Sequence, residues 1–126
     1  MSNEPLVSII INCFNGEKYL RKCIESVISQ TYKNWEIIFW DNKSSDRSAQ
    51  IFKSYKDTRL KYYIADNHSS ILYQARNYAL DKAGGEFIAF LDADDWWLPI
   101  KLSKQIILFN DQEVGLVYGN IWRYFE

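Results

Sequence analysis

The strongest constraint on the fold is an alternation between two kinds of apolar pattern along the chain. Short, mostly β-branched apolar runs predict buried strands, and apolar residues at three- and four-residue spacing predict amphipathic helices between them. The predicted strands cover residues 6–11, 35–40, 60–65, 86–91 and 114–118, and the predicted helices cover residues 17–30, 46–55, 70–83 and 99–109. This order is typical of an α/β protein with an open, mostly parallel sheet and helices on both faces.

Several residues indicate the place of a strand in the sheet or the ends of the predicted helices. The third predicted strand is more polar than the others, so we expect it near an edge of the sheet. Ser69 or Ser70 is expected to cap the third helix, and Gly84 and Gly85 are expected to end it. Pro99 suits the first turn of the fourth helix.

Composition narrows the class of protein further. The chain has 126 residues, of which 48% are hydrophobic and 25% charged, with a formal net charge of -1, as in an ordinary globular protein rather than a nucleic-acid-binding one. Cys13 and Cys23 fit neither a redox pair nor a zinc framework, so we expect reduced thiols. We expect a cytoplasmic protein without a signal peptide, and a peripheral contact with the inner face of the membrane stays open.

Three polar segments follow predicted strands, at residues 12–16, 41–46 and 92–97. Parallel α/β sheets bind ligands at the carboxyl ends of their strands, so these segments are expected to meet in one binding site. Ser44, Ser45 and Asp46 are also expected to cap the second helix.

The sharpest local feature is the acidic cluster Asp92, Asp94 and Asp95, directly after a buried strand. Three carboxylates so close together repel one another unless a cation or hydrogen-bond donors offset their charge. Mn²⁺ or Mg²⁺ accepts such oxygen ligands and can bridge two phosphates. A solvated acidic loop is the alternative, but its place at the binding edge of the sheet favours a metal site.

Other candidate residues carry weaker signals. Asp41 ends the second strand and can accept hydrogen bonds from a base imide or a ribose hydroxyl, or it can form an ordinary Asx turn. Arg76 can reach a nucleotide phosphate, or it is an exposed or ion-paired arginine. One of Trp96 and Trp97 is expected in the core, and His68 receives no role.

Taken in order, several segments resemble family 2 glycosyltransferases of the GT-A fold. They are VSIIINCFN at 7–15, WEIIFWDN at 35–42, ARN at 75–77, GEFIAFL at 85–91 and DADD at 92–95. Each segment is a weak signal, and the ordered set covers nearly the whole chain.

The resemblance implies an inverting transfer from a nucleotide-diphosphate sugar, usually a UDP sugar, to an acceptor hydroxyl, with Mn²⁺ or Mg²⁺ as cofactor. It implies bacterial-type polysaccharide or glycolipid synthesis, with a carbohydrate or lipid-linked acceptor and no nucleic acid partner. The substrate-binding residues that it implies are Cys13, Phe14, Asn15, Asp41, Arg76, Asp92 and Asp94, and the metal ligands are Asp94 and Asp95.

This chain departs from the family pattern in two places. The family commonly has Pro-Thr where this chain has Asn12 and Cys13, and the loop 66–70 lacks the usual glycine. In the family, the catalytic base lies well downstream of the metal motif, so we expect it beyond Glu126. Residues 1–126 are therefore expected to form a single nucleotide-sugar-binding domain that precedes an acceptor-binding portion.

Three other classes of protein are alternatives to a glycosyltransferase. A binding module of the same fold would hold the nucleotide sugar without turning it over. A phosphoacceptor receiver domain needs an acidic pair after the first strand, where Asn12 and Cys13 stand. A dinucleotide-binding oxidoreductase needs a glycine-rich turn there. Association with a second copy of the chain stays open.

Overall fold

A computed structural model describes residues 4–123, and four strands form one open sheet in the order β3-β2-β1-β4. The strands are β1 (Val7–Cys13), β2 (Trp35–Asp41), β3 (Leu60–Ile64) and β4 (Phe87–Phe90). Every pairing between neighbouring strands is parallel. The predicted α/β class is confirmed, and so is the edge position of the third strand.

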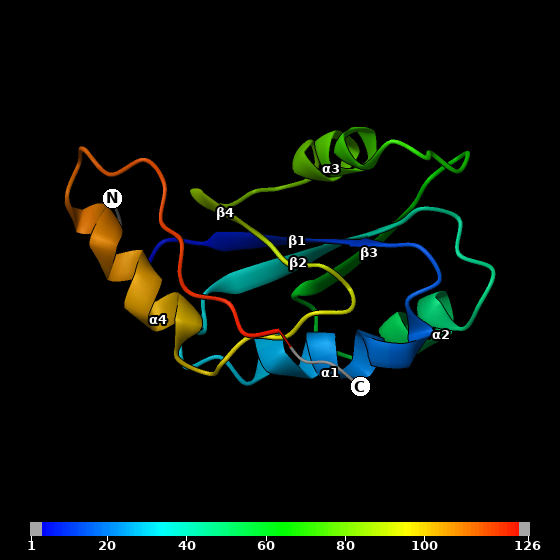
Figure 1. Cartoon of the computed structure of the whole chain (residues 1–126), viewed down its shortest axis with the longest axis horizontal. Helices are drawn as coiled ribbons and strands as arrows, with labels where there is room; N and C mark the ends of the chain where they lie inside the picture. The colour runs from blue at the N-terminus through cyan, green and yellow to red at the C-terminus, as the bar shows by residue number, and fades with distance from the viewer. Residues whose placement is uncertain (1–3, 124–126) are drawn as a thin grey trace.

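Helices cover both faces of this sheet, as predicted. They are α1 (Glu17–Ile28), α2 (Ser48–Lys53), α3 (Leu72–Leu80) and α4 (Lys101–Ile106), which continues into the 3₁₀ helix η1 (Ile107–Asn110). Helix α3 lies on one face, while α1 and α2 lie on the other (Figure 1). Within residues 4–123, no helix is long and apolar enough to cross a membrane.

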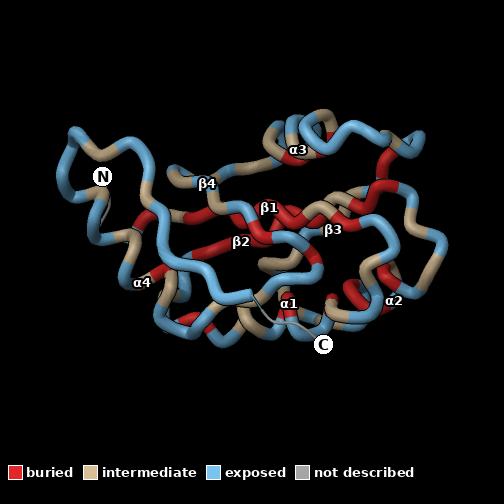
Figure 2. Tube along the Cα trace, in the orientation of Figure 1, coloured by how far each residue is buried: buried red, intermediate tan, exposed pale blue. Residues whose placement is uncertain are grey.

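The core is divided by the alternation of side chains along the central strands. Val7, Ile9 and Ile11 of β1 belong to the larger cluster, together with the buried residues of α1. Ile10 of β1 points to the opposite face, where it forms a smaller cluster with Ala79 of α3. Figure 2 shows the buried trace concentrated in β1 and β2. Because successive residues of a strand face opposite ways, this parity also governs the residues at the strand ends.

The amino ends of the strands are joined by a polar network around Glu36. Its carboxylate accepts hydrogen bonds from Ser8 Oγ at 2.7 Å, Lys61 Nζ at 2.5 Å and the Gly84 amide at 2.8 Å. Burial by itself raises the pKa of Glu36, but the hydrogen bonds from Lys61, Ser8 and Gly84 outweigh it and lower the pKa below its usual value. A Cβ at Gly85 would lie 2.6 Å from the Leu6 carbonyl oxygen, so the strands approach too closely there for a side chain.

Gln30 fastens the start of α4 to the end of α1. Its buried side chain donates to the Leu98 carbonyl at 2.7 Å and to the Ser26 carbonyl at 3.1 Å. Its Oε1 accepts a hydrogen bond from the Leu102 amide at 3.0 Å. Since residues 98–102 follow the acidic cluster, Gln30 fixes the segment that leaves the predicted site.

Four predicted local features are wrong. Helix α3 ends at Leu80 with Asp81 as its C-cap, so Gly84 and Gly85 do not end it, and Pro99 precedes α4, whose N-cap is Ile100.

Residues 114–118 form no strand, and the side chains of Leu116 and Tyr118 are largely exposed. An apolar run becomes a strand only where a neighbouring strand pairs with it, and none does so within the described residues. Neither Ser69 nor Ser70 caps α3, because its N-cap is Ile71, with no side-chain cap hydrogen bond. Ser69 instead bonds with the loop after β2, as described below.

Of the three residues expected to cap the second helix, only Asp46 bonds to the start of that helix. Asp46 accepts a hydrogen bond from the Ser48 amide at 2.9 Å, at the first residue of α2. Its other oxygen accepts from the Glu17 amide at 3.0 Å, at the first residue of α1, and Glu17 accepts in return from the Arg47 amide. The two helix starts therefore satisfy each other's amides, whereas Ser44 and Ser45 bond to Asn15 instead.

Candidate functional site

The first two polar loops meet through Asn15. Its backbone amide donates to Ser44 Oγ at 2.9 Å, and its side-chain oxygen accepts from the Ser45 and Asp46 amides at 2.8 and 3.3 Å. Asn15 has a φ of 52°, a left-handed conformation that asparagine tolerates better than most residues. The loop after β1 is thus bound to the loop after β2, as the sequence predicts.

The third loop joins them at Gly16. A Cβ at Gly16 would lie 2.9 Å from Cys13 Sγ and 3.2 Å from the Cβ of Ala93, which leaves almost no space for a side chain. The thiol of Cys23 in α1 also contacts the carbonyl oxygen of Asp92 at 3.5 Å. Residues 92–97 therefore lie against the loop after β1, and the three loops form one surface at the carboxyl edge of the sheet.

A cavity of about 310 Å³ opens at this edge, on the face of the sheet that carries α3. It is lined by Asn12, Cys13, Phe14, Asn42, His68, Ser69, Ser70, Leu72 and Ala75. Its walls combine apolar and aromatic side chains with a few amides and hydroxyls, as is typical of small-molecule sites. Two of the predicted substrate-binding residues, Cys13 and Phe14, lie in this wall, and burial raises the pKa of the Cys13 thiol.

Asp41 does not line the cavity. Its side chain is buried, with one oxygen accepting from the Ser44 amide at 2.8 Å and the other from the Tyr62 hydroxyl at 2.6 Å. Strand parity explains this, because Asp41 follows Phe39 on the face of α1 and α2, whereas the next residue, Asn42, emerges toward α3. The Asp41 side chain accepts from the amide three residues on, not two, so this bond is not the alternative Asx turn, and the predicted contact with a base stays a prediction.

Sequence reasoning assigned a binding role to only Cys13 and Phe14 among the residues of the cavity wall, and Asn42 and His68 are among those that it missed. The Asn42 side chain donates to the Ser69 carbonyl at 2.6 Å and accepts from the Ser69 amide at 2.9 Å, which fastens the loop 66–70 over the sheet. His68 Nδ1 lies 3.0 Å from the Asn42 carbonyl oxygen, and its ring contacts Phe14 at a centroid distance of 4.3 Å. The alternation along β2 was a usable signal for Asn42, whereas nothing local marked His68.

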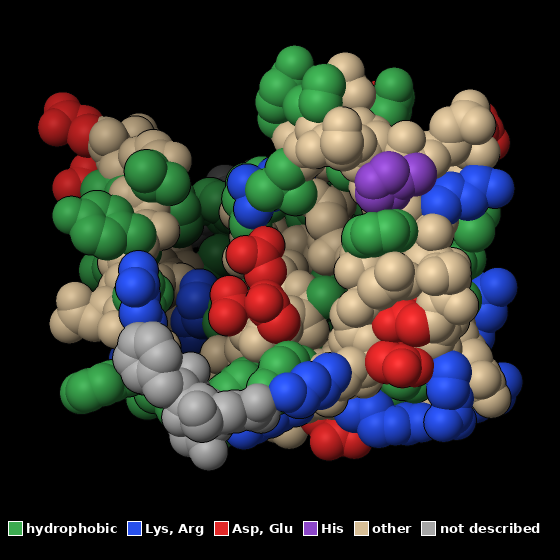
Figure 3. Space-filling model, turned by 45° about the vertical axis from the view of Figure 1, so that its right-hand side comes forward, with side chains coloured by type: hydrophobic (Ala, Val, Ile, Leu, Met, Phe, Trp, Pro, Cys, Tyr) green, Lys and Arg blue, Asp and Glu red, His purple; other side chains and the backbone are tan. Residues whose placement is uncertain are grey.

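The acidic cluster lies on the exposed side of the same edge. Asp92, Asp94 and Asp95 place carboxylate oxygens within 4.8 Å of one another. Burial raises the pKa of Asp95, and repulsion from Asp94 and Asp92 raises it further. Figure 3 shows acidic side chains gathered on the same face of the molecule as the histidine, coloured purple. An oxygen-only donor set that carries excess negative charge suits a hard divalent cation such as Mn²⁺ or Mg²⁺.

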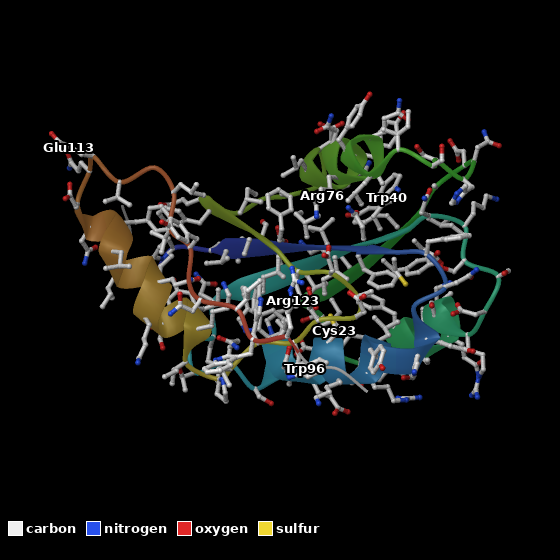
Figure 4. All side chains as sticks on the ribbon, in the orientation of Figure 1. Cys23, Trp40, Arg76, Trp96, Glu113 and Arg123 are labelled. Atoms are coloured by element: carbon white, nitrogen blue, oxygen red, sulfur yellow. The ribbon has the colours of Figure 1, made fainter. Side chains whose placement is uncertain are left out.

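Arg76 connects this cluster to the cavity. Its guanidinium lies 3.4 Å from a carboxylate oxygen of Asp92 and stands over the ring of Phe90 at 5.3 Å. The preceding residue of α3, Ala75, lines the cavity. Figure 4 labels Arg76 on the side of α3 that faces the sheet. One turn of α3 therefore borders both the cavity and the acidic cluster.

The two tryptophans after the cluster have different surroundings. Trp97 packs against the larger core cluster beneath Lys101, whose ammonium lies 4.3 Å from its ring centroid. Trp96 lies outside that cluster and has Lys22 over its ring at 3.6 Å. The expectation that one indole belongs to the core is confirmed, and that indole is Trp97.

A parallel α/β sheet with an aromatic-walled cavity and a cluster of three carboxylates at its carboxyl edge has the arrangement in which open α/β sheets bind their ligands. The family model of "Glycosyl transferase family 2" matches residues 8–126, and the chain belongs to this family. This membership agrees with the resemblance seen in the sequence.

Curated relatives include named bacterial glycosyltransferases. The chain is 40% identical over 118 residues to the UDP-Glc:alpha-D-GlcNAc-diphosphoundecaprenol beta-1,3-glucosyltransferase WfgD of Escherichia coli, covering 94% of this chain and 46% of that protein. It is 38% identical over 106 residues to the putative teichuronic acid biosynthesis glycosyltransferase TuaG of Bacillus subtilis, covering 82% and 41%. The chain therefore spans less than half the length of these relatives.

Solved structures share the GT-A arrangement. The S. aureus TarS 1-349 structure in complex with UDP-GlcNAc superposes with a TM-score of 0.78 at 30% identity, covering 84% of this chain and 31% of that one. The mannosyltransferase PcManGT from Pyrobaculum calidifontis, in complex with GDP-Man and Mn²⁺, gives a TM-score of 0.70 at 22% identity, covering 82% and 31%. The second likeness supports the fold alone.

Proposed function

We propose that this chain binds a nucleoside diphosphate sugar across the carboxyl edge of its sheet and serves its transfer, with inversion, to an acceptor hydroxyl. The observation that carries the proposal is the adjacency of cavity and acidic cluster along α3, where Ala75 lines the first and Arg76 pairs with the second. A nucleotide has the same layout, with a flat base at one end and an anionic diphosphate at the other.

The base belongs in the cavity. Phe14, Leu72 and Ala75 supply apolar walls, and the His68 ring beside Phe14 extends the aromatic surface. We propose a UDP sugar as donor, because WfgD is named for UDP-Glc and the TarS complex holds UDP-GlcNAc. Asp41 accepts hydrogen bonds from Ser44 and Tyr62 and so shapes the loop beneath the cavity, and its contact with the base stays a prediction.

The diphosphate belongs at the acidic cluster. Asp94 and Asp95 would hold Mn²⁺ or Mg²⁺, with Asp92 beside them and directed toward the ribose. The bound cation would stabilise the negative charge that the leaving diphosphate develops. Arg76 adds a positive charge at the same place, because its guanidinium already faces Asp92. Cation and guanidinium together offset the repulsion between the carboxylates and the incoming phosphates.

The acceptor half of the reaction is proposed from relatives. WfgD is named for a diphosphoundecaprenol-linked acceptor, so we propose a lipid-linked or carbohydrate acceptor for polysaccharide or glycolipid synthesis, met at the inner face of the membrane. The attacking hydroxyl must lose its proton to a general base. We expect an acidic side chain in that role, downstream of the residues described here.

Calorimetric titration of the chain with UDP, with and without Mn²⁺, tests the proposal. We expect Mn²⁺ to tighten UDP binding about tenfold or more, and Asp94→Asn to abolish that gain while leaving the melting temperature near that of the wild type. Asp81→Asn, an exposed change after α3, is the matched control and should keep the metal effect. Equal UDP affinity in wild type and Asp94→Asn, with Mn²⁺ present, would contradict the assignment.

A further inference from the structure

The cavity contains one buried polar atom whose bonding is unsatisfied. Oδ1 of Asn12 is buried and has no hydrogen-bond partner among the residues that the structure describes. Asn12 stands on β1 in the middle of the sheet, between the buried residues Ile11 and Cys13, and its side chain faces the cavity. The other buried atoms in this condition, the indole nitrogens of Trp35 and Trp40, belong to residues that do not line the cavity.

Three of the neighbouring polar side chains of the wall, those of Asn42, His68 and Ser69, already have hydrogen-bond partners within the protein. The Asn42 amide exchanges two hydrogen bonds with the Ser69 backbone, and His68 Nδ1 contacts the Asn42 carbonyl. Ser69 Oγ also bonds with Gln74 at 2.9 Å. A buried acceptor left unpaired costs free energy, so such an atom in a binding cavity indicates a partner that arrives with the ligand.

We propose that the Asn12 carboxamide is a specificity-determining contact that pairs with the imide edge of the donor's base. A carboxamide offers a carbonyl beside an N–H, and an imide such as that of uracil offers an N–H beside a carbonyl, so two reciprocal hydrogen bonds form. No hydrogen bond within the described residues holds the Asn12 side chain, which leaves it able to turn and present both groups. This inference rests on the proposed function, because it takes the cavity as the base site.

Asn12→Leu separates this role from a structural one, since leucine has nearly the same volume but cannot hydrogen-bond. Removing an unpaired buried acceptor should leave the melting temperature of the ligand-free chain unchanged or raise it by about 2–5 °C. Affinity for UDP should fall about tenfold. Asn110→Leu, in the exposed η1 segment, is the control and should keep wild-type affinity. A purely structural asparagine would give the reverse, a lower melting temperature with unchanged affinity.

A modified ligand identifies the contact. N3-methyluridine diphosphate lacks the imide N–H, so it should bind the wild type about tenfold more weakly than UDP and bind Asn12→Leu no more weakly than UDP does. If Asn12→Leu binds UDP like the wild type, or pays the same penalty for methylation, the Asn12 contact is refuted while UDP binding and the proposed function stand. If the wild type binds none of UDP, GDP and dTDP, with or without Mn²⁺, the proposed function and this inference fall together.

Discussion

Gln30 shows how one buried polar side chain can hold a loop in position. One of its three hydrogen bonds is to Ser26 of α1, and the other two are to Leu98 and Leu102. Gln30→Leu would leave the Leu98 carbonyl and the Leu102 amide without their partners in the protein interior. We expect the free energy of unfolding in urea to fall by about 2–4 kcal/mol.

The control for this change is Gln50→Leu, an exposed glutamine of α2, which should alter the free energy of unfolding by less than about 0.5 kcal/mol. The same free energy of unfolding for Gln30→Leu and the wild type would show that the three hydrogen bonds contribute nothing net.

Glu36 makes stability depend on pH. Its pKa is lowered in the folded protein, because hydrogen bonds from Lys61, Ser8 and Gly84 outweigh the effect of burial. The carboxylate therefore contributes stability above its unfolded pKa of about 4.3, and this contribution is lost as the pH falls through the lower folded pKa. Denaturant titrations should show the wild type exceeding Glu36→Gln most above about pH 5, with the difference shrinking below about pH 4. A difference that is constant with pH would contradict this.

Residues of the candidate site could be predicted from sequence only where a polar or acidic residue stands directly at the carboxyl end of a predicted strand. Asp92, Asp94 and Asp95 were found because carboxylates directly follow a buried strand, and the structure brings them together. Asp41 ends β2 and is predicted to contact the base, a prediction that stays open, while side-chain parity places Asn42 rather than Asp41 in the cavity wall. His68 could not be found in this way, because its place depends on a loop that folds back onto the sheet.

At the scale of elements, the two helix starts on one face of the sheet depend on each other. Helix α2 has six residues, too few to be stable alone, and Asp46 accepts hydrogen bonds from the first residue of both α2 and α1. Asp46→Ala should lower the free energy of unfolding by about 1–2 kcal/mol in chemical denaturation. The exposed change Asp66→Ala serves as control, and an equal effect of both changes would show that the shared cap is not the cause.

Strands were predicted well where the described chain contains a neighbouring strand that pairs with them. The four strands of the sheet were placed to within one or two residues, because each is an apolar run that pairs with a neighbour. The run at 114–118 has the same local composition but no strand beside it in the described chain. Helix α2 is shorter than the predicted 46–55, although Tyr55, beyond its end, still packs against the larger core cluster.

At the scale of the whole molecule, apolar surface is concentrated in the segment after η1. Ile121 and Trp122 are 81% and 93% exposed, and Leu116 is 80% exposed. Contiguous exposed apolar side chains promote association. Sedimentation velocity should therefore show self-association at high concentration, and the double change Ile121→Ser/Trp122→Ser should reduce it. Tyr73→Ser, at an exposed residue of α3, should not. A wild-type chain that stays monomeric throughout the concentration range would refute this expectation.

The placement of the Glu36 network has a consequence for how this scaffold can be altered. Ser8, Glu36, Lys61 and Gly84 lie at the amino ends of the strands, whereas the cavity and the acidic cluster lie at the opposite edge. Because the strands are parallel, the length of the sheet separates the residues that secure strand register from those proposed to select the donor. Changes in the loop 66–71 would accordingly leave the Glu36 network in place, which makes this loop the first place to diversify in a library that aims to retarget the proposed donor pocket.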